Sequence, residues 1–402
     1  MSATDRFLDK GPNKFSPQHP ANPVFFAGRS EEISTFKKSA INSSKLNPPM
    51  PENFSILGEW GMGKTSLLYE FDYIVLNELG QSISCVSFNF PLSPNICKTW
   101  ESFSISLINN IKHSIESNER GLKAKLIEEL KNWDPELGIG PLKLRRRAKD
   151  SQVDLAGALE ELWVKYLKPK EISTAFIFID DFHYLPAVKD DDLFMNLRTT
   201  IQYLVKKGCS YSLIVAATSS MYSNAVEIGE PMHRFFKKHR LRNFTLNETR
   251  EAVNKRISPE EGSLKIEEEV IMRVYSKTGG HPYITMFTMH ELIENADTLN
   301  IDVEYFNSQW DSIKRSIWSS DFYSVVSELP KEERDLLIRI SKGELKESPS
   351  LIYLDNEEDG ELIDSLERRG LILKIIKGKY KIFNPLFGDF LRDSNEMEKF
   401  ET

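Results

Sequence analysis

Gly58-Glu59-Trp60-Gly61-Met62-Gly63-Lys64-Thr65 lies between a short apolar run, Phe54–Leu57, and an apolar-periodic stretch that begins at Ser66. Its spacing is G-x-x-x-x-G-K-[ST], in a turn that follows a predicted strand and opens a predicted helix. Glycines let backbone N–H groups converge on phosphate oxygens, and the helix adds the positive end of its dipole. The stretch therefore predicts a phosphate-binding loop. The alternative, a glycine-rich turn without a ligand, has no need of Lys followed by Thr.

Each residue type of this loop has a role in binding a nucleotide. The Lys64 ammonium reaches the β- and γ-phosphates, and the Thr65 hydroxyl is a ligand for Mg²⁺. The contacts with ATP that we predict from this stretch are Gly58, Trp60, Gly61, Met62, Gly63, Lys64, Thr65 and Ser66.

The composition is that of a globular protein, with 40% hydrophobic and 28% charged residues in 402. This length accommodates two or three domains. No apolar run approaches the roughly 20 residues of a membrane helix, and residues 1–20 lack the apolar core of a secretory signal. The three cysteines, Cys85, Cys97 and Cys209, are widely spaced, which favours reduced cytoplasmic thiols. A net charge of −8 argues against binding of nucleic acid through the overall charge of the protein.

Short apolar strands alternate with helices as far as residue 246. Strands are predicted at 54–57, 82–90, 174–179, 211–217 and 242–246, and helices at 100–131, 156–166 and 192–206. Such alternation favours a parallel sheet with helices on both faces, whose ligands bind at the carboxyl ends of the strands. We therefore expect an α/β fold, a P-loop NTPase core over residues 22–246, after a flexible lead-in over 1–21.

The pattern becomes helical after residue 246. Asn247 is a candidate helix cap with Glu248 in the first turn. Further helices are predicted at 266–277 and 301–318, and between them Gly279-Gly280 ends one helix while Pro282 starts the next. These helices predict a lid over residues 247–320.

The last predicted unit spans residues 321–402. Helices at 331–341 and 359–369 precede two strands, 371–376 and 380–383, which meet at a turn around Gly378. Two or three helices followed by a small hairpin describe a winged-helix domain.

Two carboxylates follow the fully apolar third strand. Asp180 and Asp181 come directly after Phe176–Ile179. Mg²⁺ beside a nucleotide needs a second protein ligand, and the attacking water needs a group that orients or deprotonates it. We therefore expect Asp180 to hold Mg²⁺ together with Thr65, and Asp181 to act on the water. The alternative is that both carboxylates only cap the following loop.

Three further segments carry signatures of one ATPase family. Residues 23–33 (PVFFAGRSEEI) look like F-x-G-R-x-x-E-[IL], residues 180–185 (DDFHYL) look like a D-D-x-x-x-L box, and residues 279–282 (GGHP) look like a G-x-P signature. Together with the glycine-rich loop, they resemble the archaeal-type STAND ATPases and the related origin-recognition branch of the AAA+ ATPases. The resemblance covers roughly residues 22–393.

This resemblance implies that ATP lies between the sheet and the lid. It implies that Phe26, Gly28 and Arg29 border the adenine, and that His281 and Pro282 face the base or the phosphates. Each of these assignments has a local alternative. Gly28-Arg29 can be a turn before a helix, Pro282 a helix-starting proline, and His281 a surface residue at a helix start.

The sequence also departs from parts of the family. Where AAA+ proteins place a polar sensor residue, the fourth strand ends in Ala217-Thr218-Ser219-Ser220, so Thr218 or Ser219 can hydrogen-bond the γ-phosphate or the attacking water. Plant and animal STAND switches often carry an arginine here, which Ser220 is not. Phe383 replaces the histidine that those switches place against bound ADP. Both departures favour the archaeal-type subgroup and argue against an ADP latch.

Residues 231–235 (PMHRF) resemble the P-x-x-G-R segment of origin-type and archaeal-type ATPases. In that segment the arginine can reach the γ-phosphate of a neighbouring subunit, and a charge supplied in trans is a large rate factor. Arg234 is therefore our candidate arginine finger. The alternative is a structural ion pair or a solvated charge.

The charges of the predicted winged helix do not favour DNA. Its would-be recognition helix carries Arg368 and Arg369 against six acidic residues: Glu357, Glu358, Asp359, Glu361, Asp364 and Glu367. Contact between the lysines of the hairpin and the DNA backbone remains an alternative. A separate basic run at 143–149 (KLRRRAK) can contact nucleic acid, a membrane surface or an acidic partner, or be a solvated loop.

We therefore expect a Mg²⁺-dependent AAA+/STAND-type ATPase that acts in the cytoplasm as a regulatory switch. Its nucleotide state would set the angle between core and lid, and so control self-assembly or a separate effector protein. Two alternatives remain open. One is a DNA-associated ATPase of the replication or transposition type that oligomerises on duplex DNA. The other is a scaffold that binds ATP without hydrolysing it.

Overall fold

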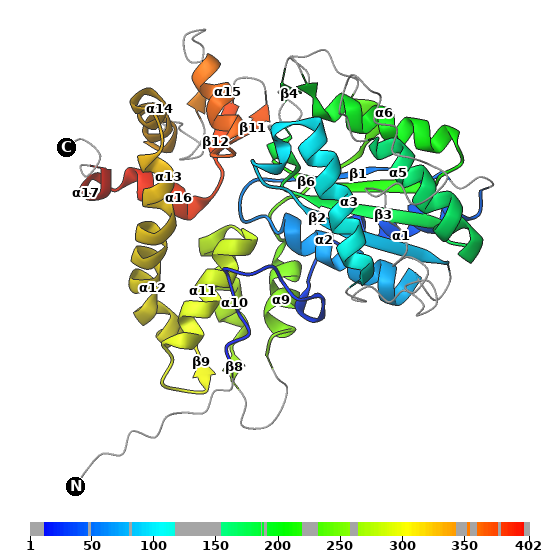
Figure 1. Cartoon of the computed structure of the whole chain (residues 1–402). Helices are drawn as coiled ribbons and strands as arrows, with labels where there is room; N and C mark the ends of the chain where they lie inside the picture. Colours follow the sequence, from blue (N-terminus) through cyan, green and yellow to red (C-terminus); the bar gives the residue numbers. More distant parts are fainter. Residues whose placement is uncertain are drawn as a thin grey trace. The chain divides into compact units, whose positions relative to one another are not determined.

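The computed structural model describes residues 12–46, 50–79, 83–116, 154–185, 187–188, 191–218, 232–257, 264–342, 352–353, 360–376 and 379–397. They form two compact units (Figure 1). The sheet unit consists of Arg29–Leu57 and Lys64–Leu241. The helical unit consists of the residues up to Gly28, the loop Gly58–Gly63 and the residues from Arg242 onward. The glycine-rich motif is thus divided between the two units after Gly63.

Five parallel strands form the centre of the sheet unit. They are β1 (Phe54–Leu57), β2 (Cys85–Pro91), β3 (Thr174–Asp180), β6 (Tyr211–Ala217) and β7 (Lys237–Arg240). Their order in the sheet is β2-β3-β6-β1-β7. The central strands β1 and β6 are buried along their whole length, as their continuous apolar sequences require. The parallel sheet is confirmed.

One strand prediction was wrong. The fifth strand lies at Lys237–Arg240 and not at 242–246. Its sequence, Lys-Lys-His-Arg, has no apolar pattern because the strand lies at the edge of the sheet, where charged side chains are tolerated and discourage pairing with other chains.

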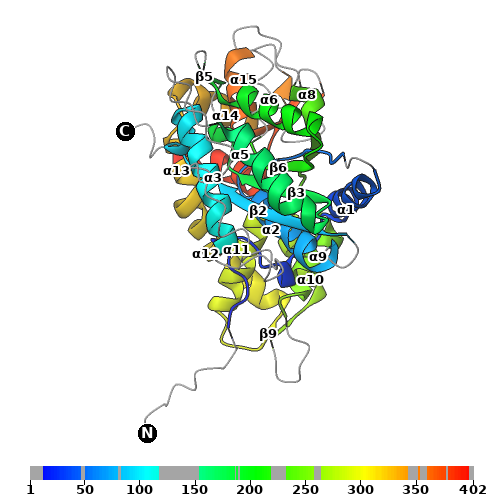
Figure 2. The same ribbon diagram turned by 45° about the vertical axis from the view of Figure 1, so that its right-hand side comes forward.

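Helices cover both faces of the sheet, as expected (Figure 2). On one face, α3 (Trp100–Glu116), α5 (Leu155–Leu162) and α6 (Leu193–Lys206) pack against β2, β3 and β6 in one apolar core. On the other, α1 (Ser30–Ser44) and α2 (Lys64–Tyr73) meet through Phe36 and Phe71, whose ring centroids are 4.2 Å apart. Phe36 also contacts Phe54 of β1 and Phe176 of β3 edge-on.

The sheet unit contains further short elements: η2 (Ile74–Glu78), η4 (Ile96–Lys98), η5 (Trp163–Leu167), η6 (Lys168–Lys170), η7 (Phe182–Tyr184), β4 (Ala187–Val188), β5 (Asp191–Asp192) and α8 (Met232–Phe235). Of these, η2 and η5 are π-helical turns that extend α2 and α5.

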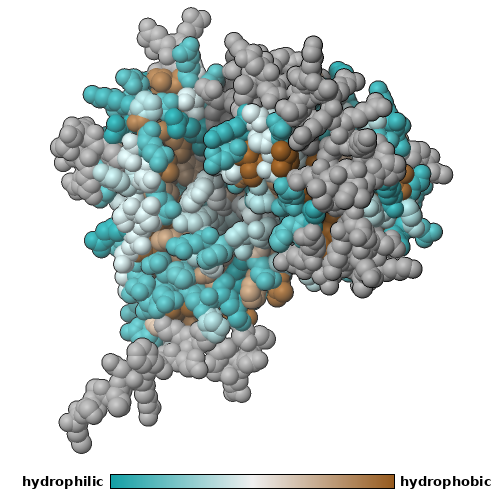
Figure 3. Space-filling model, in the orientation of Figure 1, coloured by the Kyte–Doolittle hydropathy of each residue, from teal (hydrophilic) through white to brown (hydrophobic). Residues whose placement is uncertain are grey.

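The helical unit begins with α9 (Leu246–Asn254), α10 (Glu268–Thr278), α11 (Pro282–Glu294) and α12 (Val303–Ile317), with β8 (Lys265–Ile266) pairing with β9 (Asn300–Ile301). The N-cap of α9 is Thr245, not Asn247 as expected. Thr245 and Glu248 form a capping box, in which each side chain binds the other residue's amide. On the face shown in Figure 3, the region of α10–α12 is mostly hydrophilic.

Residues 12–28 pack against these helices, with η1 at Pro23–Phe25. Phe15 is 2% exposed in a core that includes Val274 and Met289. Its carbonyl oxygen lies 2.7 Å from Nδ1 of His290. The described part of the expected lead-in is therefore packed, because Phe15 supplies an apolar anchor.

The described residues from 318 onward form η8 (Trp318–Phe322), α13 (Tyr323–Ser327), α14 (Lys331–Lys342), β10 (Ile352–Tyr353), α15 (Gly360–Arg368), β11 (Ile372–Ile376), β12 (Lys379–Ile382), α16 (Pro385–Arg392) and α17 (Ser394–Met397). We call residues 318–397 the C-terminal segment. Its three strands pair antiparallel in the order β10-β12-β11, and its core contains Leu337, Leu366 and Phe387. Among the described residues, no helix is both long and apolar enough to cross a lipid bilayer.

Candidate nucleotide site

The carboxyl edge of the sheet carries several of the predicted site residues. Asp180 ends β3 and Thr218 follows β6, and these two strands are neighbours in register, with Ile179 opposite Val215. Leu57, the last residue before the glycine-rich loop, lies opposite Ala217. Because the order is β3-β6-β1, the polar residues after three adjacent strands meet at one edge.

Thr65 and Asp180 contact each other at this edge. Thr65 lies in the first turn of α2, and its side chain is hydrogen-bonded to the Asp180 carboxylate. Burial raises the pKa of Asp180 above its ordinary value, and the charge of Asp181 raises it further. The bond from Thr65 and the positive charge of Lys64 act in the opposite direction. Asp180 is therefore a half-buried carboxylate whose charge its protein neighbours do not fully compensate.

Asp181 has a strained backbone. Its φ is +52°, in the left-handed region that non-glycine residues rarely adopt. Its amide donates to Oδ1 of Asp180 at 2.9 Å, and its carbonyl oxygen accepts from the amide of Tyr184 at 2.9 Å. Such strain costs on the order of 1–3 kcal/mol and gathers at functional sites. Here it accompanies the turn that follows β3.

The loop Gly58–Gly63 contacts the start of α11 in the helical unit. The carbonyl oxygen of Gly61 accepts from the amide of Tyr283 at 3.1 Å, and the Trp60 and Tyr283 rings lie 4.2 Å apart. A Cβ atom at Gly61 would be 2.7 Å from Cβ of Tyr283 and 2.8 Å from Cε1 of His281. At Gly63, with φ of +81°, a Cβ atom would meet nothing within 4 Å. Gly61 is thus required for packing, whereas space is open beside Gly63.

His281 and Pro282 start α11. Nδ1 of His281 caps the helix by accepting from the amide of Ile284 at 3.5 Å, and Pro282 occupies the first turn. His281 is 1% exposed, and its ring lies edge-on to Phe383 at 5.7 Å. His281 is therefore buried at a helix start and is not a surface residue. A contact of either residue with nucleotide remains a prediction.

Phe26 and Gly28 are held against α9. The Gly28 amide donates to Oε2 of Glu251 at 3.2 Å, and the carbonyl oxygen of Phe26 accepts from Nζ of Lys255 at 2.7 Å. Phe26 is buried. These bonds join the N-terminal segment, residues 12–28, to α9, which follows the last strand of the sheet.

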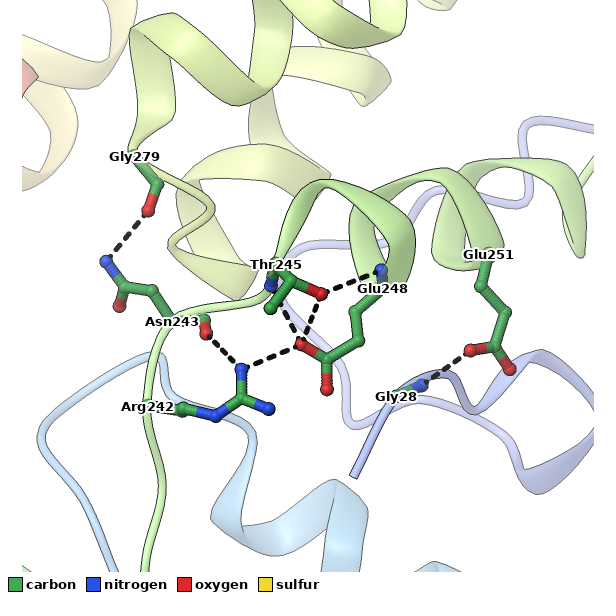
Figure 4. A network of polar contacts seen from close by, with 7 residues as sticks. All are labelled: Gly28, Arg242, Asn243, Thr245, Glu248, Glu251 and Gly279. Atoms are coloured by element: carbon green, nitrogen blue, oxygen red, sulfur yellow. Dashed lines mark hydrogen bonds and ion pairs between the residues drawn. The ribbon is translucent and has the colours of Figure 1, made fainter. Parts of the chain in front are cut away.

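Figure 4 shows the neighbouring polar network of the helical unit. Oε2 of Glu248 accepts from Arg242 at 3.0 Å and from both the amide and the hydroxyl of Thr245. Asn243 donates to the carbonyl oxygen of Gly279 at 2.9 Å, which ties the segment before α9 to the end of α10.

Arg29 belongs to the sheet unit, where it precedes α1 with φ of +60° and is 4% exposed. The turn before a helix is therefore present, and its contact with adenine remains a prediction. Thr218 is half-buried and Arg234 is exposed on α8. Ser219, Ser220, Pro231, residues 143–149 and residues 357–359 lie outside the described residues, and the side chains of His183, Arg368 and the hairpin lysines other than Lys381 are likewise not described.

No protein-family profile matches this sequence, and no curated protein matches it by sequence. Solved structures match it over almost the whole chain. The match to the Walker-type ATPase of Pyrococcus abyssi has a TM-score of 0.57 and 15% sequence identity. It covers 92% of this chain and 96% of the Pyrococcus chain. The ORC2 protein of Aeropyrum pernix, in its ADPNP–ADP complexes, has a TM-score of 0.57 and 11% identity, over 95% and 99% of the two chains. The chain has the fold of an ORC-type AAA+ P-loop ATPase.

Two positions in this AAA+ fold were not singled out from the sequence. Asp72 of α2 accepts from Ser87 at 2.5 Å and from Asn89 at 2.9 Å, both on β2, and so fixes the helix that carries Lys64. The available signal was the polar pair Ser87 and Asn89, two residues apart in an otherwise apolar strand. Tyr283 was missed because nothing in the sequence links it to Gly61.

Proposed function

We propose that this chain binds ATP together with Mg²⁺ and hydrolyses it. The observation that carries the proposal is the contact between Thr65 and Asp180, with Lys64 close enough to affect the Asp180 charge. In P-loop ATPases the hydroxyl of the loop and a strand-end carboxylate hold Mg²⁺ beside the phosphates.

The two side chains suit this cation. Mg²⁺ prefers oxygen ligands and is usually held by one or two protein groups together with the phosphates. A hydroxyl and a half-buried carboxylate with a raised pKa match that chemistry, because a divalent cation would compensate the Asp180 charge. When bound, the ion would neutralise charge on the phosphates.

The remaining residues act around this pair. The amides of Gly58–Gly63 and the Lys64 ammonium would bind phosphate oxygens, with Trp60, Met62 and Ser66 beside them. Asp181 would orient or deprotonate water, and Thr218 would hydrogen-bond the γ-phosphate or that water. The adenine would lie near Phe26, Gly28 and Arg29, with His281 and Pro282 facing the base or the phosphates.

The helical unit would change its conformation according to whether ATP or ADP is bound. We assign residues 247–320 as a lid and 321–402 as a winged-helix domain, supported by two helices and an antiparallel three-stranded sheet in the C-terminal segment. Exchange of ATP for ADP would change how the lid closes, and so control self-assembly or a separate effector protein in the cytoplasm.

Calorimetry with ATP at millimolar magnesium tests the site. Lys64→Ala should lower the affinity for ATP by at least about 100-fold, because a charge-assisted contact with phosphate is lost. Lys38→Ala is the matched control, since Lys38 is exposed on α1. Wild-type protein that ignores ATP, or Lys64→Ala protein that binds it normally, would overturn the proposal.

Phosphate release tests hydrolysis separately. Asp181→Asn should keep ATP binding and lower turnover about 100-fold or more, in the range of a lost general base. Unchanged turnover would assign the base elsewhere. Tight binding by wild-type protein without phosphate release would instead favour the non-hydrolysing scaffold.

Arg234 is our candidate for a charge supplied in trans. Arg234→Ala should slow hydrolysis only at concentrations where the protein assembles, because the residue would act on a neighbour's phosphate. An equal defect in dilute monomer would exclude this role.

A DNA-associated ATPase is the second candidate. It is favoured by the edge strand β7, where Arg240 is exposed and Lys237 is exposed but paired with Glu52 at 3.2 Å. It is disfavoured by α15, which exposes Glu361 and Asp364. Stimulation of phosphate release by duplex DNA, with a steep salt dependence of binding, would favour this alternative over the regulatory switch.

A further inference from the structure

The phosphate-binding loop has a second set of supports besides its two flanking elements. In a P-loop fold the preceding strand and the following helix fix the ends of the loop. In this chain Tyr283 also holds its middle, because its amide donates to Gly61 and its ring lies against Trp60. Trp60 is 54% exposed, and the Tyr283 ring covers part of it.

Tyr283 is itself fixed by the C-terminal segment. Its hydroxyl donates to Oδ1 of Asp321 at 3.0 Å. Burial, together with the Asp321 charge, raises the pKa of Tyr283, so the hydroxyl remains a donor at any physiological pH. Asp321 lies in η8, a π-helical turn between α12 and α13. Such turns are rare and are frequent at functional sites.

The turn η8 is anchored in the core of the C-terminal segment. Trp318 and Phe322 flank Asp321 in the turn, and Phe322 contacts Phe387 and Phe390 of α16 at centroid distances of 5.0 and 5.9 Å. A shift of α16 would therefore be expected to displace η8, since close-packed aromatic side chains have little room to absorb it.

A second contact joins the loop to the same segment. Gly370 follows α15 with φ of +72°. A Cβ atom there would lie 2.1 Å from Cγ of Glu59, so the Glu59 side chain occupies the space that a larger residue would need. Glu59 thus lies against Gly370, as Gly61 does against Tyr283.

We propose that Tyr283 is a positioning residue for the phosphate-binding loop, and that the C-terminal segment sets the loop's conformation through Asp321 and Gly370. The predicted change in ATP affinity rests on the ATP-binding function proposed above. The predicted change in the conformation of the loop does not depend on that function. The consequence is that a partner bound to the C-terminal segment would alter the affinity for ATP without touching the nucleotide.

Tyr283→Phe is the first test, because it removes the hydroxyl and keeps both the ring and the amide. Amide exchange in residues 58–63 should become faster, and the affinity for ATP should fall about three- to ten-fold, as expected for one hydrogen bond. Tyr305→Phe is the matched control, since Tyr305 donates to the carbonyl oxygen of Leu292 at 3.2 Å in the same unit. The control should change neither quantity.

A double-mutant cycle separates positioning from general stability. Asp321→Ala should have the same effect on the loop as Tyr283→Phe, and combining the two should add little, because both break the Tyr283–Asp321 bond. The bond from Ser320 that Asp321→Ala also removes is exposed. Asp321→Asn keeps an acceptor oxygen and should restore most of the affinity. Additive effects, or an Asp321→Asn variant as weak as Asp321→Ala, would contradict the proposal.

Gly370→Ala tests the second contact, with Gly208→Ala as its control. Both glycines have nearly the same backbone, φ of +72° and +74°, but only Gly370 has a neighbour where the Cβ would be. Faster exchange at 58–63 in Gly370→Ala alone is the expected result. Equal changes in both, or no change in Gly370→Ala and Tyr283→Phe, would overturn the inference. Wild-type protein that fails to bind ATP would refute the proposed function, while exchange at the loop would still decide this inference.

Discussion

The side-chain amide of Asn384 donates to the carbonyl oxygen of Thr278 at 2.5 Å, and both residues are fully buried. Oδ1 of Asn384 accepts from the Leu386 amide at 2.9 Å and so caps α16. One side chain therefore joins the end of α10 to the start of α16. The same turn contains Gly279, whose Cβ would be 2.9 Å from Cδ of Pro385.

Asn384→Ala should lower the free energy of unfolding of the helical unit by about 1–3 kcal/mol. The substitution removes one of two donors to the buried Thr278 carbonyl oxygen, which keeps the His281 amide at 3.2 Å, and it removes a helix cap. Denaturant unfolding followed by circular dichroism measures the change. Asn254→Ala, at the exposed end of α9, is the control and should change stability by less than about 0.5 kcal/mol. Equal losses in the two variants would show that the buried bond contributes nothing.

Asp180→Asn should stabilise the protein at neutral pH. Burial raises the pKa of Asp180, so the folded state favours the protonated form more than the unfolded state does. The charged group therefore lowers stability as the pH rises through its folded-state pKa, which lies above 3.8. Asparagine removes this charge and should add about 0.5–2 kcal/mol, as stabilising changes at functional sites do.

Thermal melts across pH check this prediction. The gain from Asp180→Asn should be largest near pH 7.5 and should shrink toward pH 4, where the wild-type carboxylate takes up a proton. Asp335→Asn, exposed on α14, serves as the control. A variant that is less stable than wild type at pH 7.5 would show that the Asp180 charge is well compensated within the protein.

The sequence was informative where local chemistry fixes the structure. The strands Phe54–Leu57 and Tyr211–Ala217 were predicted with their observed bounds, because buried parallel strands are continuously apolar. The first-turn position of Pro282 was also right, since a proline after paired glycines has few other places in a helix.

The features that the sequence did not reveal are those decided by contacts between residues that are distant in the chain. The strand Lys237–Arg240 looks like a charged loop until the sheet places it at an edge. The cap at Thr245 was missed although Thr-Leu-Asn-Glu fits a capping box, because Asn247 is itself a favoured cap residue. The sequence named Thr65 and Asp180 as the two Mg²⁺ ligands, but the hydrogen bond between them follows only once β3 and β1 are placed on either side of β6.

The three cysteines should resist alkylation while the protein is folded. Burial raises the pKa of Cys85, Cys97 and Cys209 to about 11, so roughly one thiol in a thousand is ionised at pH 8. Iodoacetamide at pH 8 should therefore modify them slowly in buffer and rapidly in denaturant, as followed by intact-protein mass spectrometry. Rapid modification of native protein at any of the three would show that the thiol is reached by local opening.

Arg256 should be the main side chain that holds the N-terminal segment on α9–α11. Its guanidinium donates to the carbonyl oxygens of Phe25 at 2.9 Å and Ala252 at 2.8 Å, and lies 5.7 Å from the Phe15 ring centre. Burial lowers the pKa of Arg256 to about 10, so it remains charged at neutral pH and keeps these bonds.

Arg256→Ala should cost about 2–3 kcal/mol, because a charged donor to two carbonyl groups and its ring contacts are lost together. Residues 12–28 should then be released, and trypsin should cleave after Lys14 several-fold faster than in wild type. Arg250→Ala is the control, since Arg250 pairs with Glu268 on the surface, where such a bridge contributes at most about 1 kcal/mol. If cleavage after Lys14 is equally slow in both variants, Phe15 and the bonds from His290 and Lys255 anchor the segment without the guanidinium, which then serves only to satisfy the carbonyl groups around it.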